Sequence, residues 1–126
     1  MTLLLTTVGC AKDEHKDKQQ HDCGCESEAL STVSTVGEIY FKTQVEPDDD
    51  YYNDNFWIIE KFPGSIENHY VVCNEEITKN EFDELKSSGN KIKVNFTGIK
   101  KTICKKTTAP ATILYNRIVL TSIQKQ

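Results

Sequence analysis

Long hydrophobic runs and an excess of positive charge are both missing from this sequence of 126 residues. A membrane-spanning helix needs about 20 consecutive apolar residues, and no stretch of the chain approaches that length. We therefore expect any contact with a membrane to be made through attached lipid. The formal net charge is −4, so the chain as a whole does not attract phosphate backbones, and we expect no nucleic-acid partner.

Residue patterns that carry catalysis are also scarce. The part of the chain that we expect to fold has a single histidine, His69, and no Gly-X-Ser-X-Gly motif. Glu75 and Glu76 are neighbours, so in an extended chain their carboxylates point to opposite faces and do not converge as an acid–base pair. We expect a protein that is not an enzyme and that needs no cofactor.

The N-terminus is the most informative stretch that is present. The apolar run Leu3–Val8 leads through one glycine to Cys10, and an abruptly polar segment begins at Ala11. This arrangement resembles the lipobox of bacterial lipoproteins, with Thr7 where that family prefers Leu, Val or Ile. The resemblance implies that residues 1–9 are a signal segment that is removed, and that Cys10 is anchored through two or more acyl chains. The alternative is a buried N-terminal strand with a cysteine in the core.

The polar segment after Cys10 resembles a second signal. The tetrapeptide Ala11-Lys12-Asp13-Glu14 resembles a surface-export signal of some Gram-negative lipoproteins. That resemblance implies an outer-membrane protein displayed at the cell surface, and the inner leaflet of the outer membrane is the alternative. Residues 10–31 are mostly charged or polar and lack hydrophobic periodicity, so we predict a lipidated, flexible tether there. Residues 32–126 are then one folded domain.

Period-two alternation of apolar and polar residues predicts five strands after the tether. It is clearest where Ile92, Val94 and Phe96 alternate with lysine and asparagine. Gly98 interrupts this run, as a bulge or a bend at a barrel corner would. The five predicted β-rich segments are Gly37–Gln44, Phe56–Phe62, His69–Asn74, Ile92–Cys104 and Thr112–Ile123.

One helix is predicted between the third and fourth strands. Thr78 and Glu81 have the spacing of a capping box, in which each side chain satisfies the backbone amide of the other residue. Phe82 follows as the first apolar residue of one helical face, and Gly89 sits where a left-handed C-terminal cap belongs. We predict a short helix over Lys79–Ser87 that covers part of the core.

This order of strands and helix predicts a mainly β (α+β) domain, a five-stranded OB-like barrel. Lys91–Gln124 is also similar to small lipoproteins of Gram-negative anaerobes that have OB-like domains. The similarity rests on Lys93–Gly98 and Ile118–Ile123, and it supplies no catalytic residue because those proteins mostly lack an assigned activity. An immunoglobulin-like sandwich is the alternative, but it would need about seven strands and would leave the helix unexplained.

Four of the five cysteines remain once Cys10 carries lipid. Outside the cytoplasm, four cysteines can form disulfides in three pairings. Cys73 and Cys104 lie near the ends of two predicted strands, so we weigh a disulfide between them against two separate buried thiols. Cys23 and Cys25 fall within the predicted tether.

A metal site near the N-terminus is a second use for these cysteines. The string His21-Asp22-Cys23-Gly24-Cys25 places an imidazole and two thiols close together, as zinc or copper could use. The two-residue step between the cysteines is tighter than the usual spacing of a structural zinc site, and a tether has no surrounding structure to orient ligands. We assign no metal site, and the weak candidates for one are His21, Cys23 and Cys25.

The two loops that flank the usual binding face of an OB barrel carry the candidate ligand contacts. The first loop is acidic and contains Tyr51 and Tyr52, with Trp57 just beyond it, whereas the second contains Lys105 and Lys106. Aromatic rings stack on sugars or apolar side chains, and charged loops can bind a polar ligand.

Taken together, these features lead us to expect a lipid-anchored, non-catalytic binding or scaffolding module of the cell envelope. The alternative function is an accessory protein of a surface complex that binds a glycan or peptide. The alternative for these residues is that Trp57 belongs to the core and the loops only solubilise the domain.

Overall fold

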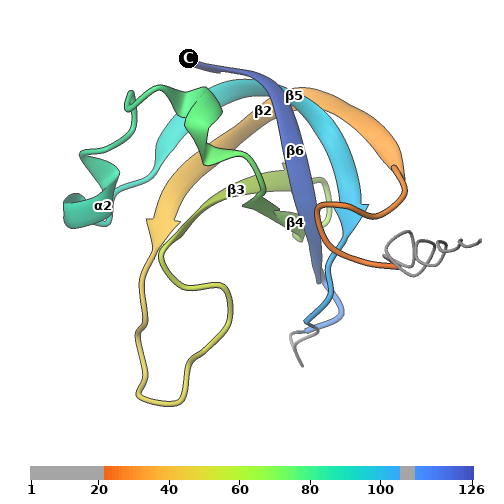
Figure 1. Ribbon diagram of the computed structural model, residues 1–126, viewed down its shortest axis with the longest axis horizontal. Helices are drawn as coiled ribbons and strands as arrows, with labels where there is room; N and C mark the ends of the chain where they lie inside the picture. Colours follow the sequence, from red (N-terminus) through yellow and green to blue (C-terminus); the bar gives the residue numbers. More distant parts are fainter. Residues whose placement is uncertain (1–21, 106–109) are drawn as a thin grey trace, which may run out of the picture.

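Five strands of the computed structural model, which describes residues 22–105 and 110–126, close into a barrel in the order β2-β3-β4-β6-β5 (Figure 1). Every neighbouring pair is antiparallel except β4 and β6, which run parallel. The predicted five-stranded OB-like barrel is confirmed, and the sandwich alternative is wrong because the strands form one closed sheet. The strands are β2 (Ser31–Lys42), β3 (Asn55–Phe62), β4 (Ile66–Val72), β5 (Ile92–Thr102) and β6 (Ile113–Lys125).

The barrel interior is filled by every second residue of each strand, as the alternation in the sequence predicted. Burying each large apolar side chain contributes about 1.5–3 kcal/mol to folding. Within the main cluster of buried side chains, Tyr70 alone has a side-chain polar atom, and its hydroxyl donates to Glu60 Oε1 at 2.6 Å. The buried side chains of this core are Ile39, Phe56, Ile58, Tyr70, Val72, Phe82, Leu85, Val94, Phe96, Ile118 and Leu120.

Two glycines let the curved strands pass close to their neighbours. A Cβ atom on Gly37 in β2 would lie 2.8 Å from Ile58 Cγ2 and 2.8 Å from the Ile59 carbonyl oxygen. Gly98 in β5 has equally close neighbours on β6. The pairing of β5 with β6 shifts between Thr97 and Gly98, so the bulge or bend predicted there is confirmed.

Gly37→Ala is expected to lower the free energy of unfolding by about 1–3 kcal/mol, the usual cost of forcing an extra methyl group into a packed interior. One of the three clashing atoms, the Ile59 carbonyl oxygen, belongs to the backbone of β3, so a side-chain rotation cannot relieve that contact. Urea unfolding checks the effect. Gly64→Ala is a control for the loss of a glycine, because nothing lies within 4 Å of a Cβ built there. Gly64→Ala is itself expected to lower the free energy of unfolding, because Gly64 has a φ of +81°, which residues with a Cβ atom rarely adopt. An unchanged midpoint for Gly37→Ala would contradict this close approach.

The segment between β4 and β5 has less helix than predicted. A 3-10 turn, η2, spans Glu75–Thr78, and a single α-helical turn, α2, spans Leu85–Ser88. Lys79 and Asn80 adopt positive φ angles of 51° and 67°, which interrupts any helix across them. No helix among the described residues is long and apolar enough to cross a membrane.

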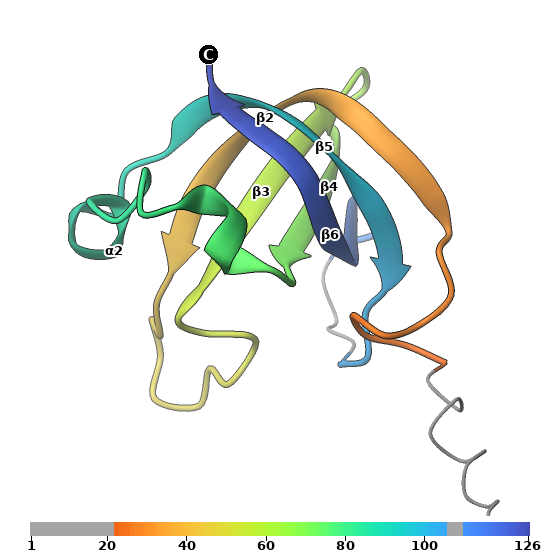
Figure 2. The same ribbon diagram turned by 45° about the horizontal axis from the view of Figure 1, so that its top comes forward.

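The predicted capping box does not form, because Thr78 makes a different local hydrogen bond. The Thr78 hydroxyl donates to the Glu75 carbonyl within η2 instead of accepting from the amide of Glu81. The break places Phe82 and Leu85 in the core at 0% and 1% exposure, and Figure 2 shows this segment lying against one end of the barrel. The predicted left-handed cap at Gly89 is confirmed, with φ of 73° and its N–H bonded to the Leu85 carbonyl.

Two disulfides join the residues before β2 to the ends of two strands. They pair Cys23 with Cys104 and Cys25 with Cys73. The expected pairing of Cys73 with Cys104 is therefore wrong, and so is its alternative of two separate buried thiols. The prediction assumed that Cys23 and Cys25 belong to a tether outside the folded domain. In the structure these two cysteines lie beside the strand ends.

The disulfides also correct the boundary of the predicted tether. The Gly24 N–H donates to the Thr102 carbonyl at 2.6 Å, and the Leu30 N–H donates to the Lys100 carbonyl at 2.9 Å. Residues 22–31 thus belong to the domain rather than to a tether. Cys10 and the signal segment at residues 1–9 lie outside the described residues.

Candidate binding face

A second group of large side chains lies on the outside of the barrel. Neighbouring strands place Tyr40 of β2 opposite Trp57 of β3, and Trp57 opposite Val71 of β4. The next row across the sheet places Ile59 opposite His69, and His69 opposite Tyr115 of β6. We call these aromatic side chains, with two tyrosines of the β2–β3 loop, the aromatic face. Its members are Tyr40, Tyr51, Tyr52, Trp57, His69 and Tyr115.

The β2–β3 loop folds over part of this face. Tyr51 packs against Trp57 with ring centroids 5.8 Å apart, and against Tyr115 at 5.6 Å in an edge-to-face arrangement. The Trp57 indole N–H donates to the Tyr52 carbonyl at 3.2 Å. Trp57 is therefore only 2% exposed. The structure brings all three predicted aromatic contacts together, but Trp57 presents no ring surface to solvent.

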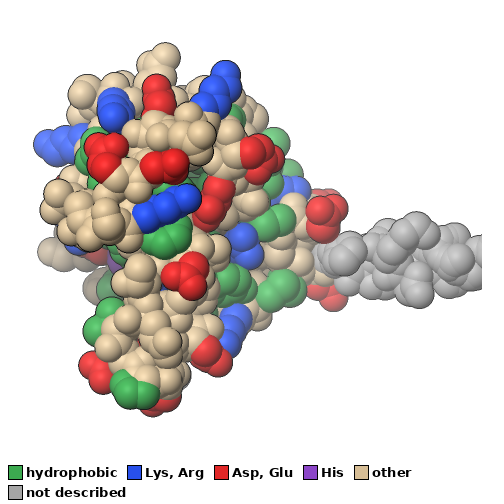
Figure 3. Space-filling view, turned by 60° about the vertical axis from the view of Figure 1, so that its left-hand side comes forward, with side chains coloured by type: hydrophobic (Ala, Val, Ile, Leu, Met, Phe, Trp, Pro, Cys, Tyr) green, Lys and Arg blue, Asp and Glu red, His purple; other side chains and the backbone are tan. Residues whose placement is uncertain are grey.

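The two loops are joined by opposite charges. The Lys105 ammonium lies 2.8 Å from Asp50 Oδ2, and the Lys105 backbone N–H donates to the Tyr52 hydroxyl at 3.2 Å. The hydrogen bond from Lys105 holds the pKa of Asp50 below its usual value. The predicted acidic and basic loops thus bind each other through this ion pair and hydrogen bond. Lys106 lies outside the described residues. The rest of the acidic loop projects from the molecule, as Figure 3 shows.

The uncovered part of the aromatic face carries the groups that sequence reasoning missed. His69 Nε2 lies 2.8 Å from Glu67 Oε1, and this hydrogen bond lowers the pKa of the Glu67 carboxyl. The His69 ring is 5.4 Å from the Tyr115 ring, and the Lys91 ammonium lies 5.3 Å from the centre of the Tyr40 ring. Aromatic surface, an imidazole, a carboxylate and one ammonium group therefore lie together on this side of the barrel.

Burial raises the pKa of the Tyr40 and Tyr51 hydroxyls from the ordinary value of 10.0 to about 12. The folded state then binds more protons than the unfolded state between these two values. The free energy of unfolding is therefore expected to fall as the pH rises from 10.0 towards 12. Below pH 10.0 these two hydroxyls should contribute no pH dependence to it.

Phenolate absorbance across an alkaline titration, combined with urea unfolding at each pH, measures both effects. Phe substitutions at Tyr40 and Tyr51 should remove two of the late-titrating groups. Tyr70 and Tyr115, whose pKa values burial also raises, remain in that variant. A single ionisation step near 10.0 for all five tyrosines of the chain would contradict the buried aromatic face.

Metal binding has no support in the described residues, because no group of three or more His, Cys, Asp or Glu side chains lies close enough to hold an ion. Cys23 and Cys25, which were weak metal candidates, are both in disulfides and so offer no thiolate. His21 lies outside the described residues. Asp49 faces the Lys42 ammonium at 3.0 Å rather than another carboxylate.

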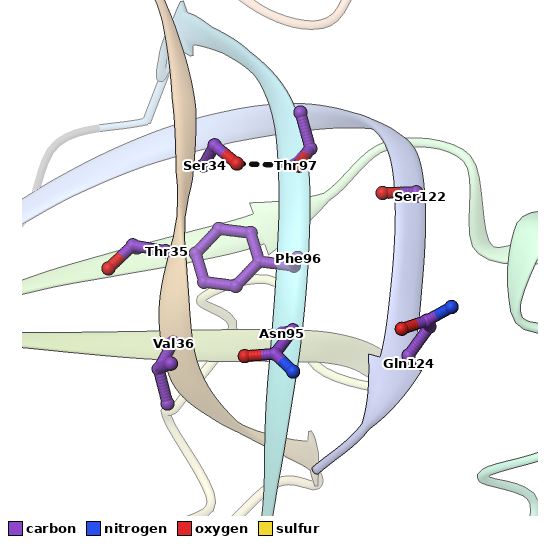
Figure 4. A pocket seen from close by; sticks show the side chains of 8 residues that line it. All are labelled: Ser34, Thr35, Val36, Asn95, Phe96, Thr97, Ser122 and Gln124. Carbon is purple, nitrogen blue, oxygen red and sulfur yellow. Dashed lines mark hydrogen bonds between the residues drawn. The ribbon is translucent and has the colours of Figure 1, made fainter.

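A shallow polar hollow of about 440 Å³ lies on a different part of the barrel, across β2, β5 and β6 (Figure 4). Ser34 and Thr97 share a hydrogen bond of 2.9 Å at one end of it. Its other polar side chains are uncharged. Its lining residues are Ser34, Thr35, Val36, Asn95, Phe96, Thr97, Ser122 and Gln124. Because it has no exposed aromatic ring and no charge, the aromatic face is the better candidate for ligand binding.

Comparison with known proteins assigns no role to these residues. No protein-family model matches the sequence, and no curated protein is similar to it.

Proposed function

We propose that this protein is a lipid-anchored, non-catalytic binding module of the cell envelope. The two disulfides support a location outside the cytoplasm, because disulfides persist in oxidising compartments. Cys10 is the proposed site of lipid attachment, and the resemblance of Ala11-Lys12-Asp13-Glu14 to an export signal favours the outer membrane and display at the cell surface.

The observation that carries a binding function is the aromatic face. It lies on β3 and β4 between the two loops, where OB barrels bind oligosaccharides and oligonucleotides. The net charge of −4 disfavours nucleic acid. The Tyr51 hydroxyl is a buried polar atom without a hydrogen-bond partner in the described part of the chain, so a ligand that supplied one would gain affinity. We propose an envelope glycan as the ligand.

Three side chains supply the proposed contacts. Tyr115 offers ring surface on which a sugar can stack, and Glu67 with His69 offers hydrogen bonds to sugar hydroxyls. Because the Glu67 carboxylate already accepts from His69, the pair is arranged to orient a ligand, and we propose no bond cleavage.

A glycan array probed with the full-length protein tests this proposal. Tyr115→Ala is expected to weaken binding by about tenfold or more, the loss expected for one stacked ring worth about 1.4 kcal/mol. Phe62→Ala is the matched control, because Phe62 is an exposed aromatic residue at 40% exposure on the opposite side-chain row of β3. The bound glycan should be recovered uncleaved. Absence of glycan binding, or equal binding by Tyr115→Ala, would refute the proposal.

A further inference from the structure

The N-terminal half of β2 has a free edge. Residues from Ser31 to Ile39 pair with β5, but only Glu38–Lys42 pair with β3. Within the described residues, Ser31–Gly37 therefore has a strand on one side only, and Figure 2 shows this half of β2 curving along the outer rim of the barrel. An unpaired edge offers a row of backbone N–H and C=O groups that another extended chain can match.

A groove begins where β2 leaves β3. The two strands touch at Gly37 and Ile59, where glycine is required, and they separate towards the N-terminal end of β2. The hollow there has a volume of about 520 Å³. Its lining residues are Thr35, Val36, Gly37, Glu38, Ile59, Lys61 and Lys93. It therefore lies directly against the free edge.

Exposed apolar side chains stand at the same end of the barrel. Phe62, Ile66 and Leu114 are 40%, 41% and 49% exposed, although each occupies the inward-facing row of its strand. They sit on adjacent strands, since Phe62 pairs with Ile66 and Leu114 pairs with Asn68. Asn68 is 2% exposed, and its Oδ1 atom has no hydrogen-bond partner in the described part of the chain. Grouped exposed apolar residues mark interaction sites.

The net positive charge of the groove favours an acidic segment among the extended partners that could bind there. Lys61 and Lys93 line it together with one carboxylate, Glu38, which lies 3.6 Å from the Lys61 ammonium. One positive charge remains uncompensated in the groove of a chain whose net charge is −4. A segment that alternates apolar and acidic side chains would place its apolar residues on Phe62 and Ile66 and its carboxylates near Lys93.

We propose that an extended, acidic and apolar segment of a partner protein pairs with the free edge of β2 at Ser31–Gly37 as an added strand. Backbone hydrogen bonds supply the affinity in this mode of recognition, and alternate side chains supply the specificity. This site is separate from the aromatic face and does not depend on the proposed glycan ligand.

The test uses the full-length protein and a synthetic peptide of about ten residues that alternates valine and glutamate, a length suited to one added strand. Hydrogen exchange followed by NMR is expected to show slower exchange for edge amides within Ser31–Gly37 when the peptide is added. A peptide that alternates valine and lysine should bind about tenfold more weakly, because each like charge near the lysines opposes docking.

Val36→Asp places a like charge on the edge and is expected to weaken binding of the glutamate peptide by about tenfold. Val45→Asp is the matched control, since Val45 is a 79% exposed valine in the β2–β3 loop. Unchanged exchange over Ser31–Gly37, or equal binding of the two peptides, would overturn the proposal. Self-association that Val36→Asp abolishes would instead identify a second copy of the chain as the occupant and would also overturn it.

Discussion

Replacement of Cys23 and Cys25 by serine, one at a time, is expected to lower the free energy of unfolding by about 2–5 kcal/mol for each disulfide removed. The two bonds close long loops, with sequence separations of 81 and 48 residues. Each loop restricts the unfolded chain, and the two bonds also tie the residues on either side of Gly24 to the ends of β5 and β4. Urea unfolding of the oxidised variants measures the loss.

The same variants test which cysteines are paired. Cys23→Ser should free only the thiol of Cys104, and Cys25→Ser should free only the thiol of Cys73, as read by alkylation and peptide mapping. Alkylation at Cys10 in an unlipidated preparation is the internal reference. Stability equal to that of the parent protein, or labelling of the opposite cysteine, would refute the observed pairing.

Trp57→Ala is the second substitution with a large expected effect. Replacing a buried tryptophan by alanine costs about 3–5 kcal/mol, and Trp57 is 2% exposed. It packs with Val71 and Ile103, so the substitution removes the support beneath the β2–β3 loop. Thermal or urea unfolding should show a much less stable protein, and hydrogen exchange should increase in Tyr51 and Tyr52.

Tyr115→Ala separates this structural role from ligand contact. Tyr115 is only partly buried, so its loss should reduce glycan binding much more than stability, whereas Trp57→Ala should reduce both. If Trp57→Ala kept the parent stability and lost only binding, Trp57 would be a ligand contact and the packing described for the aromatic face would be wrong.

Local sequence patterns predicted the five strands of this fold but not their full lengths. Alternation placed Ile92, Val94 and Phe96 on one strand and marked Gly98 as an irregular position, because side-chain direction in a strand depends only on sequence parity. The N-terminal half of β2, from Ser31, was missed because Ser-Thr-Val-Ser-Thr-Val at residues 31–36 repeats every three residues and lacks the period of two of a half-buried strand. Its pairing with β5 arises from the barrel rather than from local preference.

The helix was overpredicted because tertiary packing outweighed a local cap. Thr78 and Glu81 have a capping-box spacing that would be satisfied in an isolated helix, but Phe82 and Leu85 are both buried at the end of the barrel. The positive φ angles of Lys79 and Asn80 turn the chain so that both apolar residues reach the core. No sequence pattern in the segment signals that turn.

The disulfide pairing and the uncovered part of the aromatic face were beyond sequence reasoning, because both depend on contacts between segments far apart in the sequence. Tyr115 and His69 meet only because β4 and β6 run parallel with these residues opposite each other. The alternation of aromatic residues at outward positions was a usable signal for Tyr40 and Tyr115, but it became meaningful only with the strand order known.

Mass spectrometry of the protein extracted from membranes of its own host is the most direct test of the proposed envelope module. The proposal predicts a mature chain that begins at Cys10 with acyl groups attached and that has no free thiol among Cys23, Cys25, Cys73 and Cys104. A chain that retains Leu3–Val8, with an unmodified Cys10 and four reduced cysteines, would contradict it.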